Sequence, residues 1–147
     1  MRLVVQRTDG VKLAIDGQIH STSGRGLLIL MGTKTGDREA SCVKLADKAV
    51  NLRIFEDDQG KMNLSAIDVG AEIMIVSQFT LYADTSKGRR PAFTEALEPG
   101  EAERLYDRFI ESVGSYGLKV STGVFGARMD LRFNNTGPVT IILEHEV

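Results

Sequence analysis

Residues 27–31 are all apolar, Leu27-Leu28-Ile29-Leu30-Met31, and a glycine stands on each side of them. A strand with one face in water alternates apolar and polar residues, so this unbroken run predicts a strand that is buried on both faces. Residues 72–81 are similar, because Met74 and Val76 add a partly buried second face to an alternating apolar pattern. A chain that buries both faces of a sheet must place a further layer on each side of it.

The remaining periodicity predicts more strands than helices. Apolar residues have helical spacing at residues 37–51 and 100–113. Two helices cannot cover both faces of a large sheet, so we expect a layered α/β domain with some sheet-on-sheet packing. The chain shows neither a repeat nor a linker, and we expect a single domain over residues 1–147. The other predicted extended segments are residues 2–7, a hairpin over 11–20 with its turn at Asp16-Gly17, and residues 52–55, 119–124, 129–133 and 139–143.

The charge and hydropathy exclude several classes of protein. The formal net charge is −2, so no global basic field draws in nucleic acid. A contact with RNA would need a local patch, for which Lys87-Gly88-Arg89-Arg90 is the candidate, although such a run is more often a solvated loop. No signal peptide is recognised, and no apolar stretch approaches the roughly 20 residues of a membrane helix. We therefore expect a soluble, cytoplasmic protein that does not contact a membrane.

The chain lacks the common catalytic and metal-binding side chains. His20 and His145 have no metal-ligand spacing with acidic residues or with Cys42, the single cysteine, so we expect neither a metal site nor a disulfide. We expect Cys42 to be a packing residue and His145 to be solvated. No phosphate loop or dinucleotide fingerprint occurs, and no cofactor is expected. An enzyme with this sequence would have to use main-chain groups, hydroxyls or its own substrate.

Two polar segments interrupt the apolar pattern. One is Ser77-Gln78-Phe79-Thr80-Leu81, which alone would be a strand leaving the core. The other is Asn134-Asn135-Thr136-Gly137-Pro138-Val139-Thr140, which alone would be a turn before the last strand. Together they resemble the two signature motifs of the D-aminoacyl-tRNA deacylase family, in its bacterial and eukaryotic form.

The resemblance extends over nearly the whole chain. Residues 1–7 resemble the opening strand of the family, and residues 53–55 with 60–63 resemble its middle segment. The sequence departs from the family at Thr8-Asp9-Gly10-Val11, where a Ser-x-Ala segment is usual, and at Ala92, where a small hydroxyl residue is common. Two further matches are the Gly-x-Arg-Pro-x-Phe loop within residues 87–93 and the segment at residues 122–129.

The resemblance implies a fold, an activity and a partner. The fold is a compact domain of mostly antiparallel sheets and two main helices, layered α/β/β. The activity is hydrolysis of the ester between a D-amino acid and tRNA, and of glycyl-tRNA mischarged on tRNA(Ala). The protein would be a homodimer with its active site at the subunit interface, where it binds the 3′-terminal adenosine and the D-amino acid of aminoacyl-tRNA.

The resemblance also implies how L-amino acids are rejected. Gly137-Pro138 of one subunit would reach into the pocket of the other, with a cis bond between the two residues. Their carbonyl oxygens would accept hydrogen bonds from the α-ammonium of the substrate and crowd the position of an L side chain. Glycine has no side chain and would pass this filter. Arg7 would hold the carbonyl through a charge-assisted hydrogen bond, or would simply be a charge at the end of a strand.

By motif position, the catalytic residues would be Ser77, Gln78, Phe79 and Thr80. Thr80 could be a nucleophile, but no histidine is placed to activate it. We favour a water molecule positioned by the free ribose hydroxyl, with the main-chain N–H groups near Phe79 and Thr80 stabilising the oxyanion. Phe125 and Met129 resemble residues that line the adenine pocket, although the sequence alone would make them core residues.

Two alternatives remain open at this level. One is a sister family with a trans Gly–Pro bond, which removes mischarged L-alanine and has similar motifs. The other is a non-catalytic dimeric RNA-binding module that has the same adenosine pocket and basic loop. Turnover of D-tyrosyl-tRNA would separate these possibilities from the first.

Overall fold

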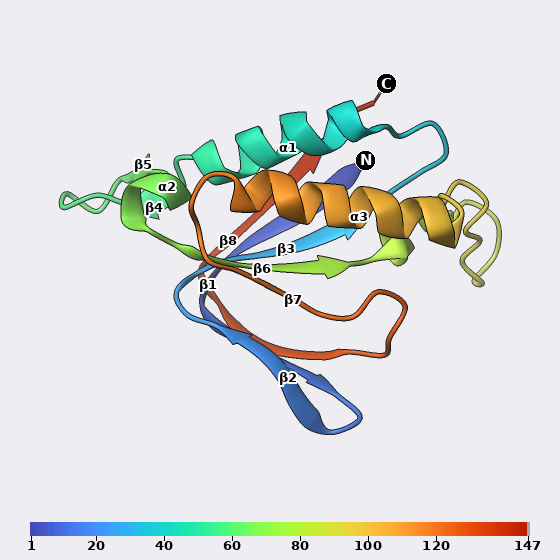
Figure 1. The fold of residues 1–147 in the computed structure, drawn as a ribbon, viewed down its shortest axis with the longest axis horizontal. Coiled ribbons are helices and arrows are strands. Elements are labelled where there is room, and N and C mark those ends of the chain that lie inside the picture. Colours follow the sequence, from blue (N-terminus) through green and yellow to red (C-terminus); the bar gives the residue numbers. More distant parts are fainter. Residues whose placement is uncertain (147) are drawn as a thin grey trace.

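The computed structural model describes residues 1–146. Two long helices, α1 (Glu39–Asn51) and α3 (Pro99–Gly114), lie side by side on one face of a strongly curved sheet (Figure 1). The remaining elements are β1 (Arg2–Ile15), β2 (Gln18–Ser23), β3 (Gly26–Gly32), β4 (Phe55–Glu56), β5 (Met62–Leu64), α2 (Ala66–Val69), β6 (Glu72–Ser77), the 3-10 helix η1 (Phe79–Tyr82), β7 (Val120–Thr122) and β8 (Asp130–Glu144).

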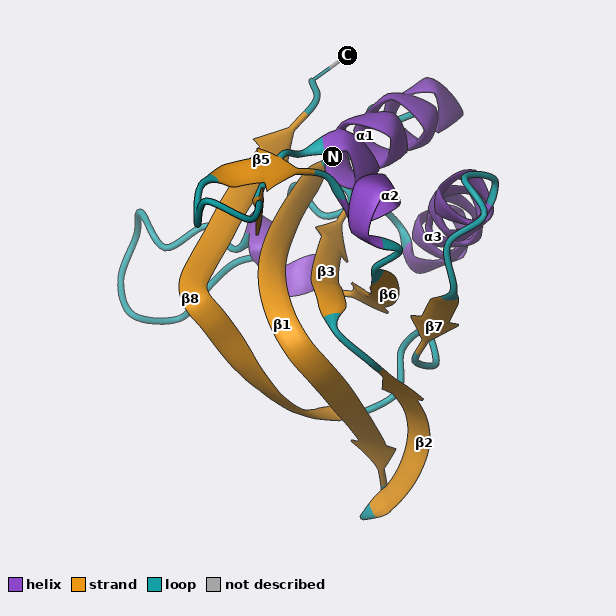
Figure 2. Ribbon diagram, turned by 90° about the vertical axis from the view of Figure 1, so that its left-hand side faces the viewer, coloured by secondary structure: helices purple, strands orange, loops and turns teal. Residues whose placement is uncertain are grey.

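The strand β1 is the centre of the sheet. On one side its first half pairs with β3 and its second half with β2, both antiparallel. On the other side both halves pair with β8, again antiparallel, so that β1 and β8 curve together along the molecule (Figure 2). Among the strand pairs within residues 1–146, only β3–β6 and β6–β7 are parallel. The sheet is therefore mostly antiparallel, as expected.

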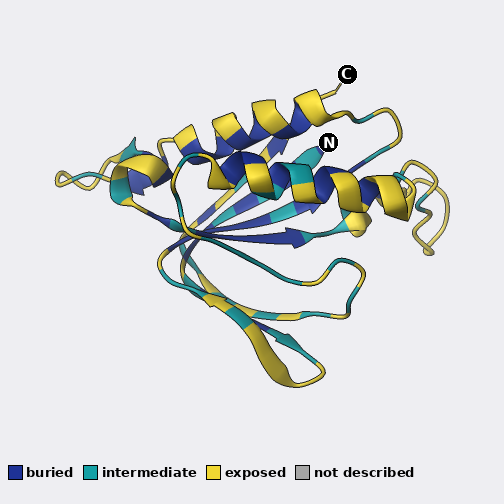
Figure 3. Cartoon of the chain, in the orientation of Figure 1, coloured by how far each residue is buried: buried dark blue, intermediate teal, exposed yellow. Residues whose placement is uncertain are grey.

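The sheet separates two apolar cores. The larger core lies under the helices, whose buried sides face the strands and whose exposed sides face outward (Figure 3). The smaller core lies on the opposite face, where Leu28, Met74 and Val76 of β3 and β6 meet Val11 and Leu13 of the second half of β1. The β1–β2–β8 half of the sheet is therefore folded back under β3 and β6. This sheet-on-sheet packing confirms the expected α/β/β layering, and it explains why residues 27–31 are apolar without alternation.

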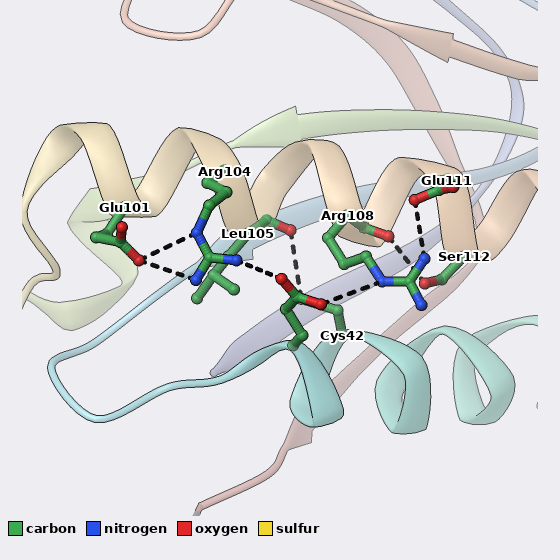
Figure 4. A network of polar contacts seen from close by, with 8 residues as sticks. Cys42, Glu101, Arg104, Leu105, Arg108, Glu111 and Ser112 are labelled. Carbon is green, nitrogen blue, oxygen red and sulfur yellow. Dashed lines mark hydrogen bonds and ion pairs between the residues drawn. The ribbon is translucent and has the colours of Figure 1, made fainter.

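A polar network joins the two helices at their outer surface (Figure 4). Arg104 of α3 binds Glu39 of α1 and also Glu101, whose Oε2 lies 2.9 Å from Nη2. Arg108 lies 3.8 Å from the same Glu39 carboxylate. Below this network the Cys42 thiol is fully buried and donates to the Leu105 carbonyl oxygen at 3.3 Å. Cys42 is thus a packing residue. The exposed ion pairs of Arg104 and Arg108 contribute about 0–1 kcal/mol each to stability.

Several predicted boundaries are wrong. Residues 2–15 form one strand instead of a strand followed by half a hairpin. The predicted strands at 129–133 and 139–143 are parts of the single strand β8, which begins at Asp130. The predicted strand over residues 72–81 ends at Ser77, after which the chain turns into η1. The turn packs on Gly32, where an added Cβ would lie 2.9 Å from Leu81 Cβ. This glycine therefore gives η1 the space to cross the end of β3.

Two other details differ from expectation. The short helix α2 was not predicted, although Ser65 and Asp68 form a reciprocal capping box at its start. His145 was expected to be solvated, but it is half-buried with Nδ1 3.0 Å from Ser41 Oγ.

Within residues 1–146, no helix is both long and apolar enough to span a bilayer.

Candidate active site

A cavity of about 620 Å³ opens at the end of β6, next to η1 and the first turn of α3. Its remaining walls come from the connection between η1 and α3 and from the segment before β8. Most of its lining is apolar or aromatic, which is typical of a small-molecule site. The lining residues are Met31, Thr33, Val76, Ser77, Gln78, Phe79, Phe93, Ala96, Leu97, Glu98, Pro99, Ala102, Tyr106, Phe125, Gly126, Ala127, Met129 and Leu131.

The first signature motif forms one rim of this cavity. Ser77 is the last residue of β6, and Gln78 and Phe79 follow it into the turn. Gln78 N–H donates to the Met31 carbonyl oxygen at 2.7 Å, which fixes the start of the turn against β3. Thr80 does not line the cavity, and its exposed hydroxyl accepts a hydrogen bond from the Gln78 side-chain amide.

Aromatic rings form the opposite walls. Phe125 and Met129 line the cavity, and the ring of Phe125 lies 6.0 Å from that of Tyr106. Tyr106 donates its hydroxyl to the Ile75 carbonyl oxygen at 2.7 Å, and burial raises the pKa of this phenol. At the mouth, Phe79 meets Phe93 edge to face with ring centres 5.0 Å apart. Such surfaces suit a flat heterocycle, since bases stack on aromatic rings.

Glu98 is a polar residue of the cavity that the sequence analysis did not single out. Its carboxylate accepts hydrogen bonds from the N–H groups of Gly100, at 2.9 Å, and Glu101, at 3.1 Å. These bonds hold the pKa of Glu98 below its usual value, so the cavity carries a negative charge near neutral pH. The sequence does carry a local signal for this residue, since Glu98 stands directly before Pro99 at the start of a helical pattern.

Among residues 1–146, no cluster of three His, Cys, Asp or Glu side chains could hold a metal ion.

The second signature motif forms a bulge in β8 opposite Arg7. Gln6 pairs with Thr140 and Thr8 pairs with Asn135, so that the single residue Arg7 faces residues 136–139. The Arg7 guanidinium donates from Nε to the Thr136 carbonyl oxygen at 2.9 Å and from Nη1 to the Ile54 carbonyl oxygen at 2.7 Å. Arg7 is 9% exposed, so it is buried and not a surface charge. Its bond in this segment goes to the Thr136 carbonyl oxygen, whereas the resemblance implied a carbonyl of Gly137-Pro138.

The bulge is closed from within by Asn135. Its Oδ1 accepts from Val139 N–H at 2.9 Å, and its Nδ2 donates to Thr140 Oγ1 at 2.7 Å. Gly137 and Pro138, at the tip, are exposed and joined by a cis peptide bond. A side chain at Gly137 would meet Arg7 Nη2 at 2.7 Å, and its φ of 127° also favours glycine.

The structure therefore divides the predicted site residues into two groups. Ser77, Gln78, Phe79, Phe125 and Met129 line the cavity, and Thr80 lies just outside it. Arg7, Gly137 and Pro138 form a separate cluster on the β1–β8 pair and do not line the cavity of the same chain.

Comparisons with known proteins are consistent with one another. A family model described as D-Tyr-tRNA(Tyr) deacylase matches residues 4–144. A protein of Aquifex aeolicus (strain VF5) named D-aminoacyl-tRNA deacylase is 48% identical over 144 residues, which cover 98% of this chain and 97% of that protein. A protein of Thermomicrobium roseum (strain ATCC 27502 / DSM 5159 / P-2) has the same name. It is 51% identical over 144 residues, which cover 98% of this chain and 94% of that protein.

Solved structures give the same picture of the fold. The structure of a c-Myc DNA Unwinding Element Binding Protein superposes with a TM-score of 0.93 and 37% identity, over 100% of both chains. A probable eukaryotic D-amino acid tRNA deacylase superposes with a TM-score of 0.84 over 97% of each chain. This second structure is 21% identical to the chain and shows a shared fold.

Proposed function

Because this chain belongs to the D-Tyr-tRNA(Tyr) deacylase family, we propose that it hydrolyses the ester between a D-amino acid and tRNA in the cavity beside Ser77, Gln78 and Phe79. The observation that carries the proposal is the position of the first signature motif. Its residues form one rim of an aromatic cavity large enough for a nucleoside, in a chain that matches named deacylases from end to end.

The main chain of η1 offers the donors for the reaction. Within residues 1–146, the N–H groups of Phe79 and Thr80 form no hydrogen bond, because they stand at the start of the 3-10 turn. A tetrahedral intermediate at the ester carbonyl carries its negative charge on oxygen, and fixed N–H donors stabilise that charge. These two groups are the oxyanion-binding donors of the proposal.

The attacking group is a water molecule in this proposal. The Thr80 hydroxyl is already bonded to Gln78, and no histidine is bonded to it within the described residues. The free ribose hydroxyl next to the ester positions the water, whose oxygen attacks the ester carbonyl carbon. The bond between this carbon and the ribose oxygen then breaks, the ribose oxygen takes the proton that the attacking water gives up, and the free D-amino acid and tRNA leave.

Selection of the D-amino acid involves a second copy of the chain. Gly137 and Pro138 are exposed and lie away from the cavity of their own chain, while Arg7 and Asn135 hold the segment that carries them. In a homodimer this segment enters the cavity of the partner. There its carbonyl oxygens accept hydrogen bonds from the α-ammonium and occupy the side on which an L residue would carry its side chain. Glycyl-tRNA mischarged on tRNA(Ala) presents no side chain and is also cleaved.

Turnover of D-tyrosyl-tRNA and L-tyrosyl-tRNA by the purified protein tests the proposal. We expect hydrolysis of the D ester and survival of the L ester, measured as release of labelled tyrosine. Preferential cleavage of L-alanyl-tRNA would instead assign the chain to an editing function for L-alanine. Binding of tRNA without turnover of either tyrosyl ester would indicate a non-catalytic RNA-binding module.

A further inference from the structure

A basic loop stands at the end of the molecule where α3 begins. We define it as residues 85–91, which lie in the olive segment beside the first turn of α3 in Figure 1. All of its residues are exposed, and three of them, Lys87, Arg89 and Arg90, are cationic. The cavity is lined by residues on both sides of this loop, Phe79 before it and Phe93 after it.

The basic loop has a defined conformation. Asp84 N–H donates to the Ala92 carbonyl oxygen at 2.7 Å, and Ala92 N–H donates back to Asp84 at 2.9 Å, so the loop is closed at its base. The Asp84 carboxylate also accepts from Ser86 N–H at 2.9 Å. Gly88 has a φ of 72°, which allows the chain to reverse at the tip. The cations are therefore presented on a hydrogen-bonded turn.

The loop is also tied to the mouth of the cavity. Phe93 follows the closing pair directly and packs edge to face on Phe79, so both ends of the loop converge on the aromatic rim. The chain beyond is fixed to the segment that follows β3, since Thr35 N–H donates to the Glu95 carbonyl oxygen at 2.9 Å. A ligand that fills the cavity and extends outward past Phe93 therefore reaches the base of the basic loop.

The charges of this loop are not neutralised by the protein itself. Within residues 1–146, Lys87, Arg89 and Arg90 form no ion pair, whereas Arg2, Arg104 and Arg108 each have a carboxylate partner. The only carboxylate inside the closed turn, Asp84, is committed to Ser86. A net charge of −2 also means that the protein as a whole repels a polyanion, so binding one requires a local group of free cations.

We propose that the basic loop binds phosphates in the acceptor end of tRNA while the aminoacyl ester occupies the cavity. The proposal rests on the proposed function for its ligand. Arginine and lysine pair with phosphate oxygens without reading the bases, so the loop contributes affinity that is independent of sequence and of the amino acid. It thereby makes tRNA a better substrate than a free amino acid ester.

Salt-dependent binding of uncharged tRNA tests this assignment. Fluorescence anisotropy gives Kd between 50 and 200 mM NaCl for the wild type and for the variant Lys87→Gln/Arg89→Gln/Arg90→Gln. Each phosphate contact contributes about 0.7–0.9 to the slope of log Kd against log salt, so the variant should lose a slope of about 2–3. Over this fourfold range of salt, the wild type should weaken roughly 20- to 40-fold more than the variant.

A matched variant removes three exposed cations elsewhere. Lys44→Gln/Lys48→Gln/Lys61→Gln changes the outer side of α1 and the turn before β5 by the same net charge. We expect this control to keep the wild-type slope. Equal slopes for all three proteins, or equal losses in both variants, would overturn the assignment of the phosphate contact to the basic loop.

Kinetics on D-tyrosyl-tRNA separate this proposal from the proposed function. The loop variant should raise KM by about tenfold or more at low salt and leave kcat within about twofold, because the contact is made equally in the ground and transition states. Absence of hydrolysis by the wild type would contradict the proposed function. Normal hydrolysis with an unchanged KM in the loop variant would contradict the phosphate contact alone.

Discussion

Arg7 Nε donates to the carbonyl oxygen of Thr136 at 2.9 Å, across the point where the regular pairing of β1 and β8 is interrupted. The same guanidinium donates to the Ile54 carbonyl oxygen, so one side chain holds the bulge of β8 against the segment before β4. The planar fork of arginine can reach two acceptors in fixed directions, whereas the ammonium of lysine cannot reproduce that geometry.

Arg7→Lys should therefore destabilise the protein and impair catalysis. Loss of a buried hydrogen bond from a charged group costs about 1.5–3 kcal/mol, which urea unfolding would measure. We expect kcat/KM for D-tyrosyl-tRNA to fall at least tenfold at a temperature where the variant is still folded. Arg53→Lys is the control, since Arg53 makes its bonds to Asn63 on the exposed surface. Unchanged activity in folded Arg7→Lys would show that the bulge does not take part in the reaction.

Thr80→Ala should keep most of its activity. The hydroxyl of Thr80 is bonded to Gln78 and lies outside the cavity lining, so its loss removes neither the proposed oxyanion donors nor the attacking water. By contrast, D-tyrosyl-tRNA whose terminal adenosine lacks the 2′-hydroxyl should be hydrolysed at least about 100-fold more slowly. Loss of turnover in Thr80→Ala together with normal cleavage of the deoxy substrate would identify Thr80 as the nucleophile.

Phe125→Leu should weaken binding of the terminal adenosine. Stacking of a base on an aromatic ring contributes about 1–3 kcal/mol, so KM should rise roughly 5- to 150-fold while kcat changes little. Phe109→Leu is the matched control, because Phe109 is fully buried on the inner side of α3 and does not line the cavity. The control should be less stable but should keep the wild-type KM. An unchanged KM in Phe125→Leu would mean that Phe125 does not contact the base.

The protein should discriminate by chirality and not by the size of the side chain. Comparable kcat/KM values are expected for D-tyrosyl, D-aspartyl and D-phenylalanyl esters, because the proposed filter uses main-chain oxygens on the L side only. Glycyl-tRNA should be cleaved to a measurable extent, while L-tyrosyl-tRNA survives. Steady-state kinetics on each charged tRNA give the comparison. Equal cleavage of the two tyrosyl esters, or a strong preference among D side chains, would contradict this filter.

Stability should decline in alkaline solution through Cys42. Burial raises the pKa of its thiol to about 11. The unfolded chain releases this proton near pH 8.5, so its contribution is complete below about pH 8.5 and is lost as pH rises to about 11. Unfolding in urea should show that the wild type loses about 3 kcal/mol more than Cys42→Ala over this range. Burial also raises the pKa of Tyr106, which should leave a residual decline above pH 10 in both proteins. Parallel curves for the two proteins would contradict the role of Cys42.

Most of the fold could be predicted from local patterns. The helices at α1 and α3 are confirmed within about two residues of their predicted ends, and the two-sided burial of residues 27–31 is confirmed by the two cores on either side of β3. The patterns failed where strands bend. Periodicity reports which residues are apolar, but it carries no signal that β1 and β8 continue through a bulge, since that depends on hydrogen bonds between segments far apart in the chain.

The residues that line the cavity were harder to predict from the sequence than the two signature motifs. The motif at Ser77–Thr80 could be recognised, and Phe125 and Met129 could be assigned to the pocket by resemblance. The turn η1, which follows Ser77, was predicted as part of a strand, because Phe79 and Leu81 continue the alternating pattern that begins at Ile73. The 3-10 conformation depends on the tertiary contact of Leu81 with Gly32, which no local propensity reports. Glu98 directly before Pro99 is a local signal for the start of a helix, but that signal does not report that α3 packs beside the cavity, and Glu98 was therefore missed.

The pairing of β1 with β8 has a consequence for how the chain is made. During synthesis β1 can pair early with β2 and β3, which follow it closely in the chain, but one entire edge of it waits for residues 130–144. Contacts of such long sequence separation form late in folding and leave an open strand edge in the meantime. The nascent chain therefore exposes an aggregation-prone edge until residues 130–144 have been made. The hydrogen bond from Arg7 to the Thr136 carbonyl oxygen joins residues 129 positions apart, so it can form only after β8 has been made.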